Sequence, residues 1–365
     1  MNGDEHTPSV TVIAEAGVNH NGQPDLAWGL LDAAARAGAH VIKYQTFRAE
    51  ALATPGAAMA DYQQRNTGAT QSQLDMLRRL ELPLPVYREL RDEARRRGLR
   101  FLSTAFDLPS LRLLVDDLGL DELKVASGEL TNAPLLLAHA RSGARLIVST
   151  GMATLGDVEA ALGVVAFGRV AGAADKPSPE AFRQAYASRE GQAALRQGVT
   201  LLHCTSQYPA PMDQVNLRAM VTLSRAFGLP VGYSDHTMGI EVALAAAALG
   251  ATVIEKHLTL DRTMPGPDHA ASLEPDEMAA LVRGVAVVSA ALGDGVKRPQ
   301  PCEEDTARVA RKSLVAVAPI RPGDVLDDSR VGVMRPGDGM SPLAYWHLLG
   351  RRATRAYEPG DMLDE

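Results

Sequence analysis

Hydrophobic and polar positions alternate in a regular order between residue 10 and about residue 290. Short apolar runs recur along this span, and amphipathic stretches rich in Ala and Leu separate them. This order is typical of a parallel α/β fold, in which a covering helix follows each strand. The apolar runs are 10–14, 40–44, 99–103, 122–126, 145–149, 199–203, 230–234 and 252–256, and the clearest helix candidates are 24–37, 85–97, 216–226 and 276–292.

Eight strands with intervening helices favour a (β/α)8 TIM barrel, which usually takes about 250 residues. A doubly wound sheet is the competing fold. It is disfavoured because no G-x-G-x-x-G or G-x-x-x-x-G-K-[ST] phosphate loop follows a strand candidate. We therefore expect a barrel domain over residues 1–293. Residues 169–198 break the pattern before the sixth strand, and we expect them to form a surface insertion.

The pattern changes after the barrel. Residues 294–311 are polar and interrupted by prolines, which indicates a linker. Residues 312–365 contain two short strand candidates and three copies of Pro-Gly-Asp, at 322–324, 336–338 and 359–361. Pro followed by Gly suits the centre of a type II turn. We expect a small β-rich domain here, which is short for independent stability unless it docks elsewhere.

Composition excludes several classes of protein. The net charge of −7 offers no basic surface for nucleic acid. No apolar run approaches the roughly 20 residues of a membrane-spanning helix, and the polar start MNGDEHTPSV lacks the features of a signal peptide. Two cysteines, Cys204 and Cys302, are too few for a disulfide framework or a cysteine zinc site. The sequence predicts a cytoplasmic enzyme that binds neither nucleic acid nor a membrane.

Polar residues follow every apolar run, where the active site of a TIM barrel lies. One polar tail is an ordinary loop, but eight tails with hydroxyls, Lys, Glu and His together indicate a site. The chain has only six lysines, and two of them, Lys43 and Lys124, lie on tails that face the predicted mouth of the barrel. Two ammonium groups with several hydroxyls suit an anionic, phosphorylated substrate. The hydroxyls are those of Ser127, Ser149, Ser206 and Ser234.

The last strand, TVIEKHLTL (252–260), carries three adjacent ionisable groups. Because side chains alternate along a strand, Glu255 and His257 point to one side and Lys256 to the other. His236 ends the preceding strand, and two imidazoles with water and substrate suit a catalytic divalent ion. The spacing does not name the metal, and it leaves open which carboxylate transfers protons and which binds sugar hydroxyls. The candidate carboxylates are Glu15, Glu129, Glu255 and Asp268.

Several long motifs, in order from about residue 10 to 363, resemble those of the sialic acid synthase family. They include IAEAGVNHNG (13–22), KYQTF (43–47), KVASGEL (124–130), YSDHT (233–237), IEKHLTLDRTMPGPDHAAS (254–272) and RPGDGMSP (335–342). The resemblance implies a TIM barrel followed by a C-terminal antifreeze-like (SAF) domain. It also implies a homodimer in which the C-terminal domains are swapped between subunits.

The resemblance implies a reaction as well. Phosphoenolpyruvate condenses with N-acetylmannosamine or a related 2-acetamido sugar and water, and phosphate leaves by C–O cleavage. A divalent ion, Mn²⁺ or Mg²⁺, polarises the aldehyde. Within this class, the alternative is a legionaminate or pseudaminate synthase that uses a 2,4-diacetamido-trideoxyhexose. An alternative from another class is a catalytically silent binding protein, which is disfavoured because only Ser206 departs from the expected polar positions.

The resemblance assigns roles residue by residue. The metal ligands are His236 and His257. The phosphoenolpyruvate contacts are Lys43, Lys124, Ser127, Ser149, Ser206 and Ser234, where Ser206 replaces an Asn and leaves open whether Gln207 contacts the phosphate instead. The acceptor-sugar contacts are Asn66, Tyr208, Asp268 and, from the partner subunit's C-terminal domain, Arg335. The catalytic carboxylates are Glu15, which also contacts the acceptor, Glu255, and Glu129, which is the first choice for handling the attacking water.

Overall fold

The computed structural model of the chain separates into two compact units, Met1–Gly293 and Asp294–Glu365. Each unit has its own hydrophobic core. The polar N-terminal segment MNGDEHTPSV lies outside the described part of the chain, apart from Val10. The structure describes residues 10–68, 71–172 and 174–364. No helix in these ranges has the length and apolar content needed to span a bilayer.

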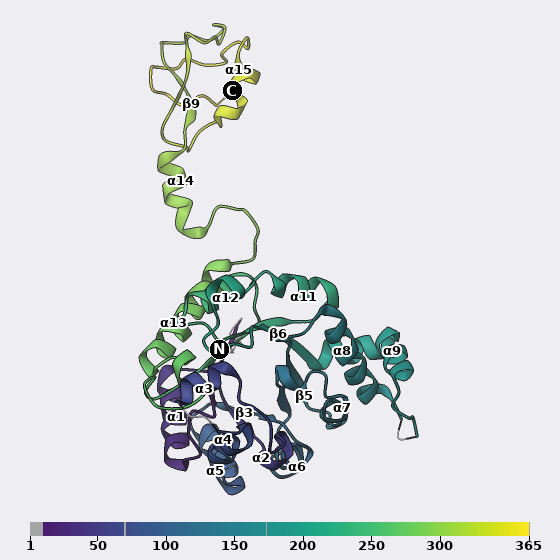
Figure 1. Ribbon diagram of the computed structural model, residues 1–365. Coiled ribbons are helices and arrows are strands. Elements are labelled where there is room, and N and C mark those ends of the chain that lie inside the picture. The colour runs from purple at the N-terminus through teal and green to yellow at the C-terminus, as the bar shows by residue number, and fades with distance from the viewer. Residues whose placement is uncertain (1–9, 69–70, 173, 365) are drawn as a thin grey trace. The chain divides into compact units, whose positions relative to one another are not determined.

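The first unit is a closed barrel of eight parallel strands (Figure 1). Each strand pairs with the next, and β1 pairs with β8 to close the ring. The strands are β1 (Thr11–Gly17), β2 (Val41–Thr46), β3 (Arg100–Ala105), β4 (Glu122–Val125), β5 (Arg145–Ser149), β6 (Val199–Cys204), β7 (Val231–Asp235) and β8 (Val253–His257). All eight apolar runs form strands, and the predicted (β/α)8 barrel is confirmed.

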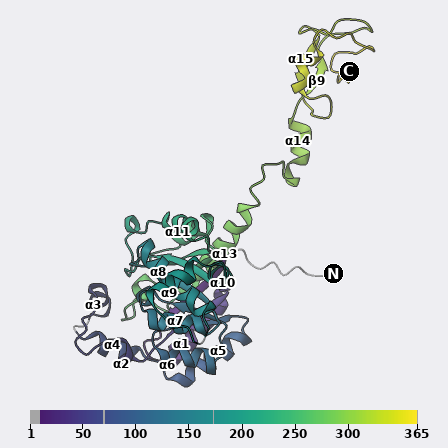
Figure 2. The ribbon, with the colours of Figure 1, turned by 90° about the vertical axis from the view of Figure 1, so that its right-hand side faces the viewer.

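Helices cover the outside of the barrel (Figures 1 and 2). They are α1 (Pro24–Ala37), α5 (Leu84–Arg96), α6 (Leu108–Arg112) with the π-helical turn η1 (Leu113–Asp117), α7 (Ala133–Arg141), α8 (Leu155–Val170), α11 (Ala219–Phe227), α12 (Glu241–Ala248) and α13 (Pro275–Leu292). Local sequence sets the ends of α1, because Pro24 starts the helix and Gly38 ends it with a φ of 77°. The helix predicted at 216–226 begins three residues later.

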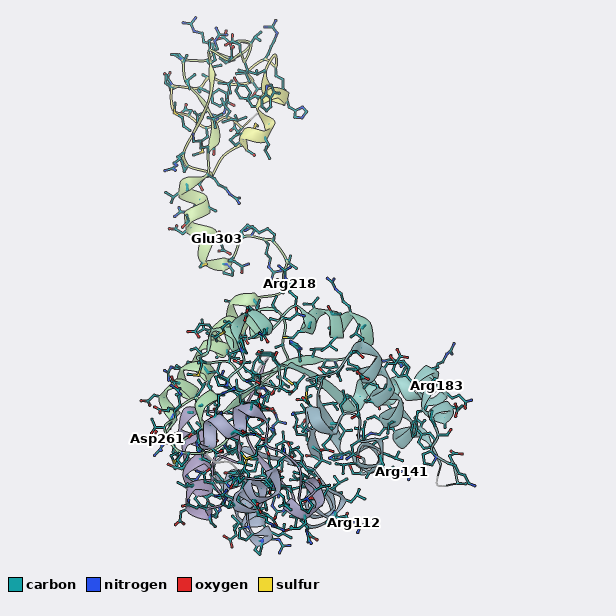
Figure 3. The ribbon with its side chains drawn as sticks, viewed as in Figure 1. Arg112, Arg141, Arg183, Arg218, Asp261 and Glu303 are labelled. Atoms are coloured by element: carbon teal, nitrogen blue, oxygen red, sulfur yellow. The ribbon has the colours of Figure 1, made fainter. Side chains whose placement is uncertain are left out.

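Two excursions depart from the simple strand–helix order. After β2, the chain forms α2 (Ala49–Leu52), α3 (Asp61–Thr67) and α4 (Gln73–Leu80) before α5. Before β6, it forms α9 (Pro179–Ala187) and α10 (Arg189–Gly198). Both α9 and α10 contact α8, and the rings of Phe167 and Phe182 meet edge to face at 5.3 Å. The predicted surface insertion is thus an extra helical layer on α8, and Arg183 projects from its outer side (Figure 3).

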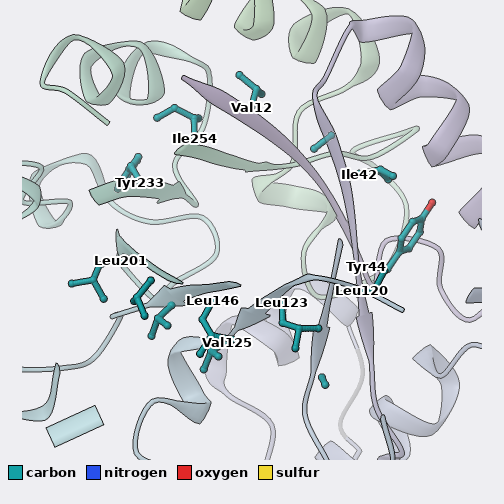
Figure 4. Packing of buried hydrophobic residues seen from close by; sticks show 14 of the residues in the cluster. Val12, Ile42, Tyr44, Leu120, Leu123, Val125, Leu146, Leu201, Tyr233 and Ile254 are labelled. Carbon is teal, nitrogen blue, oxygen red and sulfur yellow. The ribbon is translucent and has the colours of Figure 1, made fainter. Parts of the chain in front are cut away.

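Strand alternation divides the barrel residues into two sets. Val12, Ile42, Tyr44, Leu123 and Ile254 point outward and pack under the helices (Figure 4). The inward residues at the amino end of the strands fill the barrel with a separate apolar cluster, Ile13, Val41, Leu102, Ile147, Leu202 and Val253. Because the next inward positions are polar, this cluster forms an apolar floor beneath a polar upper layer.

The second unit is small and has little regular structure. Its strands β9 (Ser313–Ala316) and β10 (Val331–Met334) pair antiparallel, and α15 (Tyr345–Leu348) follows. Its core consists of Leu314, Ala316, Ile320, Leu326, Val331, Leu348, Ala353, Tyr357 and Leu363. The segment expected to be a linker contains the 3₁₀ turn η5 (Pro301–Glu303) and helix α14 (Glu304–Ala310).

Two of the three Pro-Gly-Asp segments form the expected turns. Gly323 and Gly360 have φ values of 87° and 101°, and Asp324 and Asp361 donate backbone hydrogen bonds to residues three positions earlier. This is the geometry of a type II turn. The third segment differs, because Gly337 is not left-handed and its N–H donates to the carbonyl of Arg308. Tertiary contacts override the local turn preference at this position.

Candidate active site at the carboxyl end of the barrel

A cavity of about 460 Å³ opens at the carboxyl ends of the strands. Each of the eight strands contributes one inward side chain near its carboxyl end. In chain order, these are Glu15, Lys43, Thr104, Lys124, Ser149, Cys204, Ser234 and Glu255. Loops beyond the strands add Ser127, Ser206, Tyr208, His236 and Asp268, and His257 ends β8. The polar tails predicted from sequence therefore meet in one cavity.

Two buried lysines converge on one buried glutamate. Lys43 Nζ lies 3.0 Å from Glu15 Oε2 and 3.3 Å from Glu255 Oε2. Lys124 Nζ lies 3.5 Å from Glu255 Oε1, and Ser234 Oγ donates to the same oxygen at 2.9 Å. Since buried charges are costly unless they are paired, this network compensates both ammonium groups and orients them inside the cavity. Burial lowers the pKa of Lys124, and the charge of Glu255 opposes this effect.

The two carboxyl groups bound to Lys43 differ in their protonation. Burial is the largest influence on Glu15, exceeds the effect of Lys43, and raises the pKa to about 7. Burial also favours the neutral form of Glu255, but Lys124 and Lys43 together outweigh it and lower the pKa to about 2. Environments that push two carboxyl pKa values apart are typical of acid–base sites. Glu15 can exchange a proton near neutral pH, while Glu255 stays charged.

His236 and His257 lie side by side, with ring centroids 5.5 Å apart. His236 Nδ1 lies 2.7 Å from the Thr205 carbonyl oxygen. Because a carbonyl only accepts, Nδ1 carries the proton and Nε2 keeps its lone pair. Burial lowers the pKa of His236 to about 4 and that of His257 well below its usual value. Both imidazoles are therefore neutral, which is the form that binds metals.

The imidazole pair fits a divalent ion that has open coordination positions. His257 Nδ1 is buried, has no hydrogen-bond partner within the described residues, and lies 3.9 Å from Asp268 Oδ2. No cluster of three or more His, Cys, Asp or Glu side chains suited to a metal occurs in the described part of the chain. An ion held by His236 and His257 would thus take its other ligands from water or substrate.

Small residues bring several hydroxyls together beside Lys124. The Gly151 N–H donates to Ser127 Oγ at 3.0 Å, and Ser127 Oγ lies 3.1 Å from Cys204 Sγ. A Cβ on Gly151 would come within 2.4 Å of Ser206 Oγ and within 2.8 Å of Cys204 Sγ and Ser127 Oγ. Glycine at 151 therefore lets these groups approach one another. Ser149 Oγ is buried without a partner among the described residues, so it can bind a ligand.

Tyr208 lies between the imidazoles and helix α3. Its ring centroid is 4.1 Å from that of His236 and 5.1 Å from that of Tyr62, which stacks on it. Asn66 Nδ2, from α3, donates to the Tyr208 carbonyl at 3.2 Å and to the Pro267 carbonyl at 2.7 Å. Asn66 does not line the cavity, but it ties α3 to the loops after β6 and β8.

Asp268 is held by a chain of hydrogen bonds that begins outside the cavity. Ser272 Oγ donates to the Asp268 carbonyl at 2.7 Å, and Asn19 Nδ2 donates to Ser272 Oγ at 2.8 Å. Asn19 also donates to the Leu258 carbonyl at 2.9 Å. Burial raises the pKa of Asp268 to about 7. Asn19 is a positioning residue that the sequence reasoning missed, although it lies within the motif IAEAGVNHNG.

Most residues selected from sequence line the cavity, and a few do not. Glu129 is not among its lining residues, and its carboxylate accepts a hydrogen bond from Asn132 Nδ2 at 2.7 Å, at the start of α7. Its role with the attacking water stays a prediction. Ser206 lines the cavity, whereas Gln207 is not among the lining residues. Arg335 belongs to the second unit. Gln45, Thr104 and Cys204 line the cavity and were missed, although alternation along their strands points to them.

Lys256 lies on the opposite side of β8 from Glu255 and His257. Its Nζ lies 2.9 Å from Asp235 Oδ2 and donates to the Thr237 carbonyl at 2.5 Å. Asp235 Oδ1 accepts from both the backbone N–H and the hydroxyl of Thr237. Lys256, Asp235 and Thr237 are fully buried. This ion pair joins the ends of β7 and β8 from outside the barrel and does not enter the cavity.

Comparisons with known proteins agree with this geometry. The NeuB family matches residues 30–297. An N,N'-diacetyllegionaminic acid synthase from Campylobacter jejuni is 44% identical, over 97% of this chain and 98% of that protein. The human N-acetylneuraminate-9-phosphate synthase is 33% identical, over 97% of this chain and 91% of that protein. A crystal structure of an N-acetylneuraminic acid synthetase from Leptospira borgpetersenii, in complex with citrate, has 33% identity and a TM-score of 0.65, covering 82% of this chain and 90% of that one.

Proposed function

The chain belongs to the NeuB family of sialic-acid-type synthases, and we propose that it condenses phosphoenolpyruvate with a 2-acetamido sugar and water. The reaction would release phosphate by C–O cleavage and form a nine-carbon α-keto acid. The observation that carries this proposal is the pair of buried lysines, Lys43 and Lys124, that share Glu255 beside two neutral imidazoles. That arrangement suits a small, doubly anionic substrate next to a carbonyl acceptor.

The two ammonium groups would bind the phosphate and carboxylate of phosphoenolpyruvate. Glu15 and Glu255 hold them in position before the ligand arrives, so that binding requires little rearrangement. The hydroxyls of Ser127, Ser149, Ser206 and Ser234 would complete the contacts to the anion. Ser234 already donates to Glu255, and the unpartnered hydroxyl of Ser149 is available to a phosphate oxygen.

Glu15 is suited to move the proton that the condensation requires. When C3 of the enol bonds to the aldehyde carbon, the aldehyde oxygen becomes a hydroxyl and gains a proton. Water then adds at C2 and loses a proton, and the tetrahedral adduct expels phosphate. A carboxyl group with a pKa of about 7 can donate and accept protons near neutrality. We therefore propose Glu15 as the acid–base group, while Glu255 orients the lysines.

We propose Mn²⁺ or Mg²⁺ as the cofactor, held by His236 and His257. When bound, the ion would supply Lewis-acid polarisation of the acceptor carbonyl. The neutral imidazoles and the unpaired Nδ1 of His257 support this assignment. Glu255 and Asp268 remain close enough to attract a cation into the same end of the cavity.

Removal of the metal should reduce turnover strongly. We expect chelation to lower the rate of phosphate release at least about 10²-fold, and added Mn²⁺ to restore it, because loss of one charge-stabilising group typically costs this much. The His236→Ala and His257→Ala variants should be similarly slow with or without Mn²⁺. The control is His347→Ala, whose exposed side chain lies in the other unit. Full activity of either cavity variant in chelator would contradict the metal assignment.

The proposed synthesis can be tested directly. The enzyme would be incubated with phosphoenolpyruvate and, separately, with each of several 2-acetamido hexoses. We expect phosphate to be released only when an acceptor is present, and a nine-carbon α-keto acid to appear in equal amount by mass spectrometry. Absence of phosphate release with every acceptor would overturn the proposal. Formation of a condensed product that retains phosphate would indicate an aldolase instead.

We also propose that the second unit is an antifreeze-like domain that docks on the barrel of a partner subunit. Within this unit, Leu343 and Trp346 are 87% and 78% exposed. Large apolar side chains exposed to this degree are often covered in an assembly. The unit is also small, so that docking would stabilise it. Arg335 would then reach the partner subunit's cavity and contact the acceptor sugar.

Arg335 gives this arrangement a kinetic test. We expect Arg335→Ala to raise the KM of the acceptor about 10-fold and to leave the KM of phosphoenolpyruvate nearly unchanged, because a charge-assisted hydrogen bond contributes about 1.5–3 kcal/mol. The matched control is Arg321→Ala, another exposed arginine in the same unit. Sedimentation would measure the oligomeric state in parallel. A monomeric active enzyme, or an unchanged acceptor KM, would contradict the swapped dimer.

A further inference from the structure

Helix α3 lies beside the cavity without a buried face of its own. None of its residues is fully buried. Among the described residues, the only side-chain hydrogen bonds that α3 makes beyond its own segment are the two from Asn66. The side chains of Gln64 and Thr67 donate to nearby carbonyls, those of Met59 and Gln63. Because so short a helix needs tertiary contacts to stay in place, its contacts with the site are the ones that hold it.

Two of these contacts meet at Tyr208. The Tyr62 ring stacks on the Tyr208 ring, with centroids 5.1 Å apart and an interplanar angle of 29°. One turn later, Asn66 Nδ2 donates to the Tyr208 carbonyl oxygen. Residues four positions apart lie on one face of a helix. Helix α3 therefore contacts both the ring and the backbone of Tyr208 with the same face.

Tyr208 in turn packs on both imidazoles. Its ring centroid lies 4.1 Å from that of His236 at an interplanar angle of 32°, and it meets the His257 ring edge to face at 5.6 Å. His236 Nε2 lies 3.4 Å from Ser234 Oγ, which lines the cavity. The bond from His236 Nδ1 to the Thr205 carbonyl fixes one edge of the imidazole. Stacking against Tyr208 restricts the tilt of the ring about that bond.

Resting on the proposed function, we propose that Tyr62 is a positioning residue for the metal site and acts through Tyr208. The Tyr62 ring supports the Tyr208 ring from the side opposite His236, so that the imidazole keeps the orientation that turns Nε2 toward the cavity. Groups that orient a metal-binding imidazole without touching the ion contribute to its affinity. An aromatic pair changes an equilibrium constant by about 3- to 10-fold beyond the area that it buries.

Binding of Mn²⁺ in the absence of substrates tests this inference, with free Mn²⁺ measured by electron paramagnetic resonance. We expect Tyr62→Leu to raise the Kd about 3- to 10-fold, and Tyr62→Phe to leave it unchanged because phenylalanine keeps the ring. The control is Tyr186→Leu, at a half-buried tyrosine of α9, which should bind as the wild type does. An unchanged Kd in Tyr62→Leu would overturn the inference. Equal weakening in Tyr62→Phe would also overturn it, because the hydroxyl would then be responsible.

A double-mutant cycle tests whether Tyr62 acts through Tyr208. In the Tyr208→Leu background, Tyr62→Leu should change the Kd of Mn²⁺ less than about twofold, because the ring that it supports is gone. Circular dichroism would check folding, which the absence of buried residues in α3 favours. Equal weakening in both backgrounds would overturn the route through Tyr208 and leave the proposed function intact. Mn²⁺ binding that is unchanged in His236→Ala would instead overturn the metal assignment, and the inference with it.

Discussion

Replacing Lys43 with methionine is expected to lower kcat/KM for phosphoenolpyruvate by about 10²- to 10³-fold. Methionine keeps most of the length of the lysine side chain but removes its charge. The change leaves Glu15 and Glu255 buried and facing the cavity without the cation that they share. Breaking a buried charge pair costs about 3–5 kcal/mol, and about 1.4 kcal/mol corresponds to a tenfold change. The anionic substrate loses its ammonium contact and meets two carboxyl groups.

The measurement is the initial rate of phosphate release at varied phosphoenolpyruvate, with calorimetric binding of phosphoenolpyruvate as a second readout. The matched control is Lys297→Met, at an exposed lysine outside the barrel unit, which should keep full activity. Circular dichroism would check that the Lys43 variant is folded. A folded Lys43→Met enzyme whose kcat/KM falls less than about threefold would exclude the lysine as a substrate contact.

Replacing Lys256 with methionine is expected to lower the free energy of unfolding of the barrel by about 3–5 kcal/mol. The ammonium lies 2.9 Å from Asp235 Oδ2, and both side chains are fully buried. Removing one partner of such a pair leaves an uncompensated charge in the core. The loss is large against a total stability of about 5–15 kcal/mol, although Lys256 lies outside the cavity.

Denaturant unfolding, followed for the transition of the barrel unit, measures this effect. Adding Asp235→Asn to Lys256→Met should recover part of the lost stability, because the asparagine is neutral and still accepts the hydrogen bonds from Thr237. The control Arg183→Met removes an exposed ion pair with Glu180 and should change stability by less than about 1 kcal/mol. A loss of that small size in Lys256→Met would refute the structural role of the buried pair.

The barrel and the polar end of its cavity could be predicted because two simple regularities coincide. Parallel strands that are buried on both sides have sequences that are short apolar runs. The residues that directly follow these runs lie together at one end of a TIM barrel. Strand alternation then separated Glu255 and His257 from Lys256 without any structure. The same rule points to Gln45, Thr104 and Cys204, which line the cavity but were missed because their side chains are neither acidic, basic nor those of serines.

Other features could not be read from sequence, because they depend on tertiary packing. Glu129 lies four residues beyond the end of β4, in the 3₁₀ turn η2 (Ser127–Glu129), where alternation no longer fixes direction. Nothing in the pattern of 49–80 indicates that Met76 and Leu80 of this excursion line the active-site cavity. Likewise, contacts with Arg308 rather than local preference set the conformation at Gly337.

The ion pair between Lys256 and Asp235 also bears on how the barrel closes during folding. The two residues are direct partners in the native pairing of β7 with β8, as are Ser234 and Glu255. A slip of β8 by one residue would turn Lys256 into the cavity and press Glu255 and His257 against the helices. Because the buried pair can form only in the correct register, it penalises misaligned closure. Lys256 lies outside the cavity, but its ion pair thereby helps to ensure that β8 turns Glu255 and His257 toward the substrate.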